Sequence, residues 1–316
     1  MIETLTHYKI LDRIGGGGIG ELYRARDTQL GRTVALRVIA AEIAGDPDRR
    51  ARCLSDARAA AALSHPNIAT LYEIGEDQGH LFLVCEYARG ESLKTVIAGH
   101  PVKPRRALDL AVQIADALAD AHALGIVHGD ITPDNIIVTT KGNAKILDFG
   151  LAAWTSGGAG TVPYLSPEQA LGERGDHRTD IFSLGIVVFE MLTGRLPFTG
   201  ASPDAVTLQI LQASAPAPST VIGSLPQELD PILGRALAKS LDQRYEAAAT
   251  LAAELRAVAA MLDMRSEASE AAGDVVTPGP PRRTSSRSGM LLLLLALAAL
   301  AAAAWFQRDA ILRLFR

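Results

Sequence analysis

Apolar and polar residues alternate along the first part of the chain. From Tyr8 to Ile39 the alternation is interrupted by glycines, and it returns over residues 68–87 around a polar turn that contains Gly79. Alternation with a period of two, bounded by turn residues, is typical of antiparallel strands. A segment rich in Ala and Arg, residues 47–64, has a helical pattern and separates the two groups of strands. The sequence therefore predicts a twisted antiparallel sheet accompanied by one helix.

After Gly90 the spacing of the apolar residues becomes that of helices. Helical patterns occupy residues 105–125, 179–194, 225–239 and 244–262. The first of these is amphipathic, whereas the second is almost entirely apolar, as expected of a helix that is buried on all sides. A small β-rich lobe, about residues 8–87, is thus followed by a larger helical lobe, about residues 90–262. This order predicts an α+β fold class.

The C-terminal region differs from the rest of the chain in composition. Residues 263–288 are acidic at first and then rich in Pro, Ser and Arg, which is typical of a flexible tether. Residues 290–306 carry no charge and would extend roughly 25 Å as a helix, near the shorter limit for a membrane span. We expect a single-pass transmembrane helix there, followed by a short tail, 307–316; a buried core helix is the alternative. Three arginines within 282–287 favour the cytoplasmic side of the cell membrane for the preceding domain.

Charge and cysteine content exclude several other classes of protein. The net charge of −4 argues against nucleic acid as a partner, because nucleic-acid binding usually needs a basic face. Cys53 and Cys85 have no neighbouring Cys or His cluster, so neither a disulfide framework nor a Cys/His metal site is expected. The N-terminal sequence MIETLTHYKI lacks the basic and apolar regions of a signal peptide.

The stretch GGGGIG places Gly15, Gly17 and Gly20 in G-x-G-x-x-G spacing. Glycines allow backbone N–H groups to approach a phosphate without a Cβ in the way. A dinucleotide-binding fold would continue with a helix directly after these glycines. Here ELYRARD and TVALRVI continue as strands instead. The pattern therefore favours a hairpin that covers phosphates.

Further motifs follow in a fixed order. They are VALR at 34–37, HGDITPDN at 128–135, DFG at 148–150, GTVPYLSPE at 160–168, DIFSLG at 180–185 and LDQRY at 241–245. With the glycine-rich stretch, these motifs make residues 8–262 resemble the eukaryotic-like Ser/Thr protein kinases of bacteria, with several positions degenerate. The resemblance implies a bilobal protein-kinase fold. It also implies a pair between Glu168 and Arg244, and that DIFSLG belongs to the buried helix that anchors the catalytic loop.

The resemblance further implies phosphoryl transfer from ATP with Mg²⁺ or Mn²⁺. Transfer requires a metal, a nucleotide and a hydroxyl to be held in line. Asn135 and Asp148 offer the hard oxygen ligands that Mg²⁺ prefers, and the family gives them this role. Asp130 is then the carboxylate that receives or orients the hydroxyl proton. The protein substrates of this chain are not indicated by its sequence.

A nucleotide site is implied by the same resemblance. Its members are Ile14, Leu22 and Ala35 around the adenine, the Glu86 carbonyl and Ala88 N–H toward the adenine edge, and Gly15, Gly17, Gly20 and Arg37 at the phosphates. Cys85 takes the gatekeeper position beside the adenine slot.

Several positions depart from the family pattern. Arg37 replaces the lysine of V-A-I-K, and Asp56 stands where the family has the helix glutamate. Because Arg is longer than Lys and Asp is shorter than Glu, we expect a compensated Arg37–Asp56 pair. Thr132 replaces a lysine that neutralises the transferring phosphoryl group, a loss that costs about 10²–10³ in rate if nothing compensates. Gly129 replaces the arginine that would hold a phosphorylated activation segment.

These departures leave two principal functions open. The first is a membrane-anchored Ser/Thr protein kinase with reduced activity, favoured by Asp130, Asn135 and Asp148. The second is a pseudokinase that binds ATP or protein partners and signals by conformation, favoured by Arg37, Asp56 and Thr132. A small-molecule kinase of related fold is a third hypothesis. The motif GTVPYLSPE, which resembles a peptide-binding segment, argues against it.

Gly129 also bears on regulation. A phosphate orders a loop only where a basic partner is available. We therefore expect that phosphorylation of Thr155, Ser156 or Thr161 does not control the protein, and that self-association at the membrane does. Ser285 in the tether is a candidate autophosphorylation site, with an ordinary solvated linker as the alternative.

Overall fold

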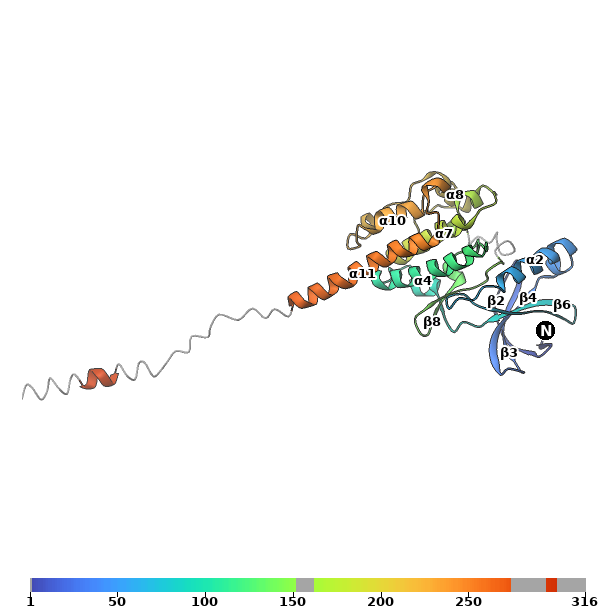
Figure 1. Cartoon of the computed structure of the whole chain (residues 1–316), viewed down its shortest axis with the longest axis horizontal. Coiled ribbons are helices and arrows are strands. Elements are labelled where there is room, and N and C mark those ends of the chain that lie inside the picture. Colours follow the sequence, from blue (N-terminus) through green and yellow to red (C-terminus); the bar gives the residue numbers. More distant parts are fainter. Residues whose placement is uncertain (1, 152–161, 274–293, 300–316) are drawn as a thin grey trace, which may run out of the picture. The chain divides into compact units, whose positions relative to one another are not determined.

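The structure, a computed structural model, describes residues 2–151, 162–273 and 294–299 (Figure 1). The chain divides into two compact units, residues 1–265 and 266–316. The first unit contains a β-rich N-lobe followed by a helical C-lobe, so the predicted α+β architecture is confirmed for this part of the chain.

The N-lobe is built on a six-stranded antiparallel sheet with strand order β1-β2-β3-β4-β6-β5. The strands are β1 (Thr4–Leu5), β2 (Tyr8–Gly17), β3 (Gly20–Asp27), β4 (Arg32–Ile39), β5 (Leu71–Asp77) and β6 (His80–Glu86). Both groups of alternating residues therefore form strands, as predicted. The pairing of β4 with β6 places Ala35 opposite Cys85, so the sheet itself brings together two residues of the predicted adenine slot.

Gly20 is required by the packing of the sheet. It has a φ of +138°, and a Cβ at this position would lie 1.9 Å from the carbonyl oxygen of Val38. No side chain fits between these two backbones, and most residues avoid this region of φ. The last glycine of GGGGIG therefore allows β3 to approach β4, independently of any ligand.

One substantial helix, α2 (Pro47–Ala60), packs against the sheet, after a short helix α1 (Ala41–Ala44). The carboxylate of Asp46 caps α2 by accepting from the N–H groups of Asp48 and Arg49, and Pro47 begins the helix. Cys53 and Ala57 of α2 are buried in a cluster that also contains Ile39, Leu83 and Leu151. This cluster joins the helix to the sheet.

The C-lobe contains the predicted helices and a small three-stranded sheet, β7-β8-β9. Its elements are β7 (Gly90–Ser92), α3 (Leu93–Ile97), α4 (Pro104–Ala123), η1 (Pro133–Asn135), β8 (Ile136–Thr139), β9 (Ala144–Ile146), η2 (Val162–Tyr164), α6 (Pro167–Ala170), α7 (His177–Thr193), α8 (Pro203–Gln212), α9 (Pro218–Val221), α10 (Leu229–Ala236), η3 (Leu241–Gln243) and α11 (Ala248–Gly273).

Helix α7 is the centre of the C-lobe. Nearly all of its residues are buried, including the charged Asp180, which confirms the prediction made from its apolar run. Asp176 caps its first turn, and Gly194 ends it in the left-handed conformation. The neighbouring helix α4 contributes Leu108, Ala111 and Leu118, at helical spacing, to the same core. The catalytic-loop motif thus follows a helix that is packed firmly in place.

Helix α11 runs past the boundary predicted at residue 263. It continues to Gly273, so the first part of the segment 263–288, predicted as a flexible tether, is helical. The sequence DMRSEASEAAG contains Ala, Glu, Met and Arg, which favour helices, and no Gly or Pro before residue 273.

The predicted membrane span, 290–306, is described only over residues 294–299, which are helical and exposed. Within the described ranges, no helix has the length and apolar character needed to cross a membrane. Most of the predicted span, the remainder of the tether and the tail 307–316 lie outside the described residues.

Candidate active site

The loop that carries HGDITPDN is anchored by one buried carboxylate. Asp180 of α7 is fully buried, and it accepts from the backbone N–H of His128 at 2.9 Å and from that of Gly129 at 2.7 Å. It also contacts His122 Nε2 at 2.7 Å. These bonds satisfy the carboxylate and fix the backbone just before Asp130. Asp180 is the first residue of the motif DIFSLG, so the resemblance that assigns this motif to the anchoring helix is the sequence signal for it.

Asp130 and Asn135 are brought together as the sequence predicts. The Asn135 side chain donates from Nδ2 to the carbonyl oxygen of Asp130 and to its Oδ2, both at 2.9 Å. Asn135 lies in η1, where Pro133 begins the turn, so the chain folds back on itself between the two residues. Because Nδ2 is used for these bonds, the amide oxygen of Asn135 is the atom available for a metal.

Asp148 follows β9 and lies on a segment that adjoins Asn135. The backbone N–H of Leu147 donates to the carbonyl of Asn135 at 2.9 Å, which ties the end of the β9 segment to η1. Asp148 has a φ of +59°, an uncommon conformation for a residue other than glycine. The three predicted catalytic and metal-binding residues, Asp130, Asn135 and Asp148, are therefore held on adjoining segments of backbone.

Arg37, which the sequence predicts to pair with Asp56, forms an ion pair with Asp148. Arg37 Nη2 lies 2.5 Å from Asp148 Oδ2, and both side chains are largely buried. Asp56 lines a separate hollow with His128 and Gly150. The ion pair that the structure gives Arg37 is therefore with Asp148, and the compensated Arg37–Asp56 pair stays a prediction.

His128 connects the loop to the DFG segment. Its Nε2 donates to the Leu147 carbonyl at 2.8 Å, while its Nδ1 accepts from the N–H of Asp130 at 3.1 Å. One nitrogen donating and the other accepting defines a neutral imidazole. The ring also packs edge-on against Phe149, with ring centroids 4.7 Å apart. His128 thus orients Asp130 and Asp148 at once.

A cavity between the lobes matches most of the predicted adenine slot. It is lined by Leu22, Ala35, Arg37, Ala69, Leu83, Cys85, Glu86, Leu147, Asp148 and Leu151. Burial raises the pKa of the Cys85 thiol to about 12, so the thiol is protonated and a poor nucleophile at neutral pH. Glu86 is held by Lys145 at 2.8 Å. Two residues predicted for the adenine slot are not among those that line the cavity. Ile14 is 41% exposed, and Ala88 lies in the segment between β6 and β7.

The other predicted phosphate-site glycines differ from Gly20. Gly15 and Gly17 both lie on β2, which pairs with β3 through the tip of the hairpin. A Cβ on Gly15 would meet only Leu22 at 3.9 Å, whereas a Cβ on Gly17 would meet nothing within 4 Å. These two positions leave open space beside the backbone, as an approaching phosphate would require.

Thr132 and Gly129, the two other residues that depart from the family pattern, lie in the catalytic loop. Thr132 is buried at 4% exposure, and it supplies no charge at the position where the resemblance predicts a lysine. Gly129 has a φ of +77°, which glycine adopts without strain.

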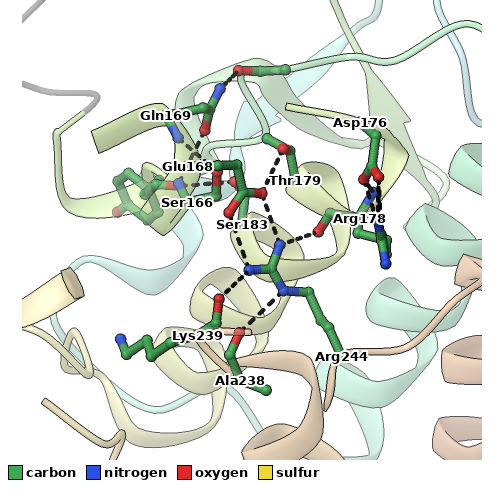
Figure 2. Close-up of polar contacts among 12 residues, drawn as sticks. Ser166, Glu168, Gln169, Asp176, Arg178, Thr179, Ser183, Ala238, Lys239 and Arg244 are labelled. Carbon is green, nitrogen blue, oxygen red and sulfur yellow. Dashed lines mark hydrogen bonds and ion pairs between the residues drawn. The ribbon is translucent and has the colours of Figure 1, made fainter. Parts of the chain in front are cut away.

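A buried ion pair joins α6 to the residue that follows η3. Arg244 Nη1 binds Glu168 Oε1 at 2.8 Å, and Nη2 binds Oε2 at 3.2 Å (Figure 2). Glu168 also accepts from the Thr179 hydroxyl at 2.7 Å. Burial opposes ionisation of Glu168, but the Arg244 guanidinium outweighs it and lowers the pKa of this carboxyl. The predicted Glu168–Arg244 pair is confirmed.

A two-lobed fold with Asp130, Asn135 and Asp148 at the junction of the lobes defines the protein kinase class. Residues 8–255 match the protein kinase domain family. The chain is 41% identical to the serine/threonine-protein kinase PrkC of Bacillus subtilis over 258 residues, 79% of this chain and 40% of that protein. It therefore belongs to the protein kinase family, among the bacterial eukaryotic-like Ser/Thr protein kinases.

Two further comparisons support membership of the protein kinase family. The chain is 38% identical to the serine/threonine-protein kinase PknB of Mycobacterium tuberculosis over 263 residues, 78% of this chain and 42% of that protein. The crystal structure of the Mycobacterium tuberculosis PknI kinase domain matches with a TM-score of 0.66 at 25% identity, covering 80% of this chain and 96% of that domain. The chain spans about two fifths of the length of the curated relatives PrkC and PknB.

Proposed function

We propose that the protein is a Ser/Thr protein kinase that transfers the γ-phosphate of ATP to hydroxyl groups of protein substrates. The observation that carries the proposal is the bond from Asn135 to Asp130, with Asp148 on the adjoining segment. This arrangement places a proton-accepting carboxylate beside two potential metal ligands. The curated relatives named above are serine/threonine-protein kinases.

The residues present fit a magnesium or manganese ion. Mg²⁺ prefers oxygen ligands and is usually held by one or two protein groups together with water and substrate phosphates. Asp148 offers a carboxylate and Asn135 an amide oxygen, since its Nδ2 is already bonded to Asp130. When bound, the ion would neutralise charge on the phosphates of ATP. No three His, Cys, Asp or Glu side chains in the described ranges form a site that would hold a metal alone.

Each catalytic residue then has a defined task. Asp130 accepts or orients the proton of the substrate hydroxyl, and its position is fixed by Asn135 and His128. Arg37, which lines the nucleotide cavity, supplies positive charge toward the phosphates. Its present bond to Asp148 must be exchanged or shared when a metal binds that carboxylate. Thr132 supplies no charge, so we propose a reduced rate of transfer.

Nucleotide binding is the first test of this proposal. ATP with Mg²⁺ is expected to raise the melting temperature, because a ligand of the native state stabilises it by mass action. Asp148→Ala should remove the Mg²⁺-dependent part of that increase, whereas Asp134→Ala, which loses only an exposed pair with Lys94, should retain it. The measurement is thermal unfolding with ATP alone and with ATP plus Mg²⁺ or Mn²⁺. A wild-type protein unaffected by millimolar ATP under both conditions would contradict nucleotide binding.

A pseudokinase is the second candidate, and one contact favours it. Arg37 neutralises Asp148 at 2.5 Å, which weakens this carboxylate as a metal ligand. Such a protein would bind nucleotide without transferring phosphate. A γ-phosphate transfer assay with the purified chain, Mg²⁺ or Mn²⁺, and an Asp130→Ala control separates the two functions, since transfer that disappears in the control excludes the second.

We also propose that residues 290–306 anchor the protein in the cell membrane, with the kinase domain in the cytoplasm. The support is the uncharged apolar run and the arginines that precede it. The full chain is expected to stay in the membrane fraction through carbonate and high-salt washing, whereas an electrostatically bound protein would be released by salt. A chain truncated after residue 289 is the control. Release of the full chain by carbonate would contradict the anchor.

Self-association at the membrane is the proposed mode of control. Its support is Gly129, which provides no cation for a phosphorylated segment; Thr155, Ser156, Thr161 and Ser285 lie outside the described residues. Phosphotransfer is expected to rise when the protein is clustered on vesicles, with little change on Thr155→Ala combined with Ser156→Ala. A large loss from the double substitution without any gain from clustering would show that the segment is the switch.

A further inference from the structure

Gln169 directly follows the motif GTVPYLSPE and makes two side-chain hydrogen bonds. Its Nε2 donates to the carbonyl oxygen of Gly129 at 2.7 Å, and its Oε1 accepts from the backbone N–H of Ser166 at 3.0 Å (Figure 2). The Ser166 hydroxyl accepts in return from the N–H of Gln169, which completes a capping box at the start of α6. One amide group therefore caps a helix with its oxygen and contacts the catalytic loop with its nitrogen.

The carbonyl that Gln169 binds belongs to the peptide group between Gly129 and Asp130. The N–H of that same peptide donates to His128 Nδ1 at 3.1 Å. The preceding N–H, that of Gly129, donates to Asp180 at 2.7 Å. The backbone entering Asp130 is thus held at three successive polar groups by the side chains of His128, Asp180 and Gln169. Of these three side chains, that of Gln169 comes from α6.

The bond from Gln169 matters because the residue that it holds is a glycine. Glycine has no side chain with which to bind another element, so the contact that position 129 makes with α6 is through its backbone carbonyl. Its φ of +77° is natural for glycine but leaves the peptide free to rotate unless neighbouring groups hold it. Gln169 supplies a bond that resists this rotation.

We infer that Gln169 is a positioning residue: by holding the Gly129 carbonyl, it couples α6 to the catalytic loop and keeps Asp130 in place for proton transfer. The inference rests on the proposed phosphotransfer. Helix α6 begins within the motif GTVPYLSPE at 160–168, so the bond from Gln169 also links the end of the activation segment to Asp130. In this chain the order of α6 is communicated to Asp130 by a neutral hydrogen bond that needs no phosphate.

Two substitutions separate this role from simple helix capping. Gln169→Glu keeps an oxygen that accepts from Ser166, so the capping box survives, but its carboxylate has no donor for the Gly129 carbonyl. Gln169→Leu loses both bonds. If only the cap matters, Gln169→Glu should behave like the wild type. If the bond to Gly129 matters, Gln169→Glu should be impaired while its melting temperature stays close to that of the wild type.

The experiment measures phosphate transfer by the full chain over a range of pH. At pH 8 we expect Gln169→Glu to lower kcat by about tenfold, because small displacements of a catalytic group are costly, with the KM for ATP unchanged. As the pH falls through the pKa of the introduced carboxyl, its protonated form can donate again. The activity relative to wild type should then recover, and Gln169→Leu should show no such recovery.

Amide hydrogen exchange over residues 128–131 gives a readout that is independent of activity. Exchange in this segment should be faster in Gln169→Glu than in the wild type. If kcat, its pH profile and the exchange rates all match the wild type, Gln169 acts only as a cap and the inference is wrong. A wild-type protein without any transfer would instead overturn the proposed function, and the exchange rates would still decide whether Gln169 holds the loop.

Discussion

Asp130→Asn is expected to lower kcat for phosphate transfer by about 10²–10⁴-fold, the usual contribution of a general base. The substitution keeps an oxygen that can accept from Asn135 Nδ2, so the loop should retain its geometry. What it removes is the ability to take up a proton. The melting temperature and its increase with ATP and Mg²⁺ should therefore stay close to wild-type values.

The matched control for this experiment is Asp134→Asn. Asp134 lies in the same loop, but its carboxylate is exposed and paired with Lys94 at 2.8 Å. Exposed pairs of this kind contribute little to stability. Steady-state kinetics of both variants distinguish a specific effect from a general disturbance of the loop. Equal activity of Asp130→Asn and wild type would remove Asp130 from the catalytic mechanism.

Arg244→Met is expected to destabilise the fold by about 3–5 kcal/mol, as is usual when one partner of a buried ion pair is removed. The guanidinium of Arg244 is fully buried, and besides Glu168 it donates to the carbonyls of Ala238, Arg178 and Lys239 (Figure 2). Its loss leaves a buried carboxylate and three carbonyls without this donor. Urea denaturation of the variant and the wild type measures the difference.

Arg256→Met provides a matched control, because Arg256 forms an ion pair with Asp116 at 2.8 Å in which both side chains are about half exposed. Its loss should cost less than about 1 kcal/mol. The double variant Arg244→Met with Glu168→Gln should be more stable than Arg244→Met alone, since the uncompensated charge is gone. A single variant as stable as wild type would show that the pair is not structural.

The pH dependence of stability follows from the same pair. Because the folded-state pKa of Glu168 is lowered, its contribution is fully present above the unfolded value of about 4.3 and is lost as the pH falls through the folded-state pKa. In Arg244→Met the burial of Glu168, which raises its pKa, is opposed only by hydrogen bonds such as the one from Thr179, so the pKa rises relative to the wild type. The stability gap between wild type and variant should therefore narrow in acid, and denaturation at pH 7 and pH 4 measures this change.

The parts of the fold that the sequence predicted are those governed by local periodicity. The alternation from Tyr8 to Ile39 and the apolar run at 179–194 form strands and a buried helix, because each pattern matches one regular backbone geometry. The extension of α11 to Gly273 escapes prediction because the acidic residues of 263–273 are equally typical of a solvated linker, although their helix propensity is high.

The residues of the site likewise divide into those that local sequence predicts and those that it does not. Asp130, Asn135 and Asp148 meet because short segments and backbone hydrogen bonds fix their spacing, so a linear motif contains the necessary information. The ion pair between Arg37 and Asp148 joins residues far apart in the chain, so no linear motif contains it. Gln169 escapes prediction because its contact with Gly129 joins segments far apart in the chain, although the capping box itself has a sequence signature.

The glycines of the hairpin have a consequence for how related sequences are interpreted. Gly20 would be retained even by a descendant that had lost its nucleotide, because a methyl group there would collide with the Val38 carbonyl and separate β3 from β4. Its presence therefore says nothing about ligand binding. A methyl group at Gly17 would meet no atom within 4 Å, so packing does not protect this position from mutational drift. Of these two glycines, Gly17 is the one whose loss would mark a lineage released from selection for ATP.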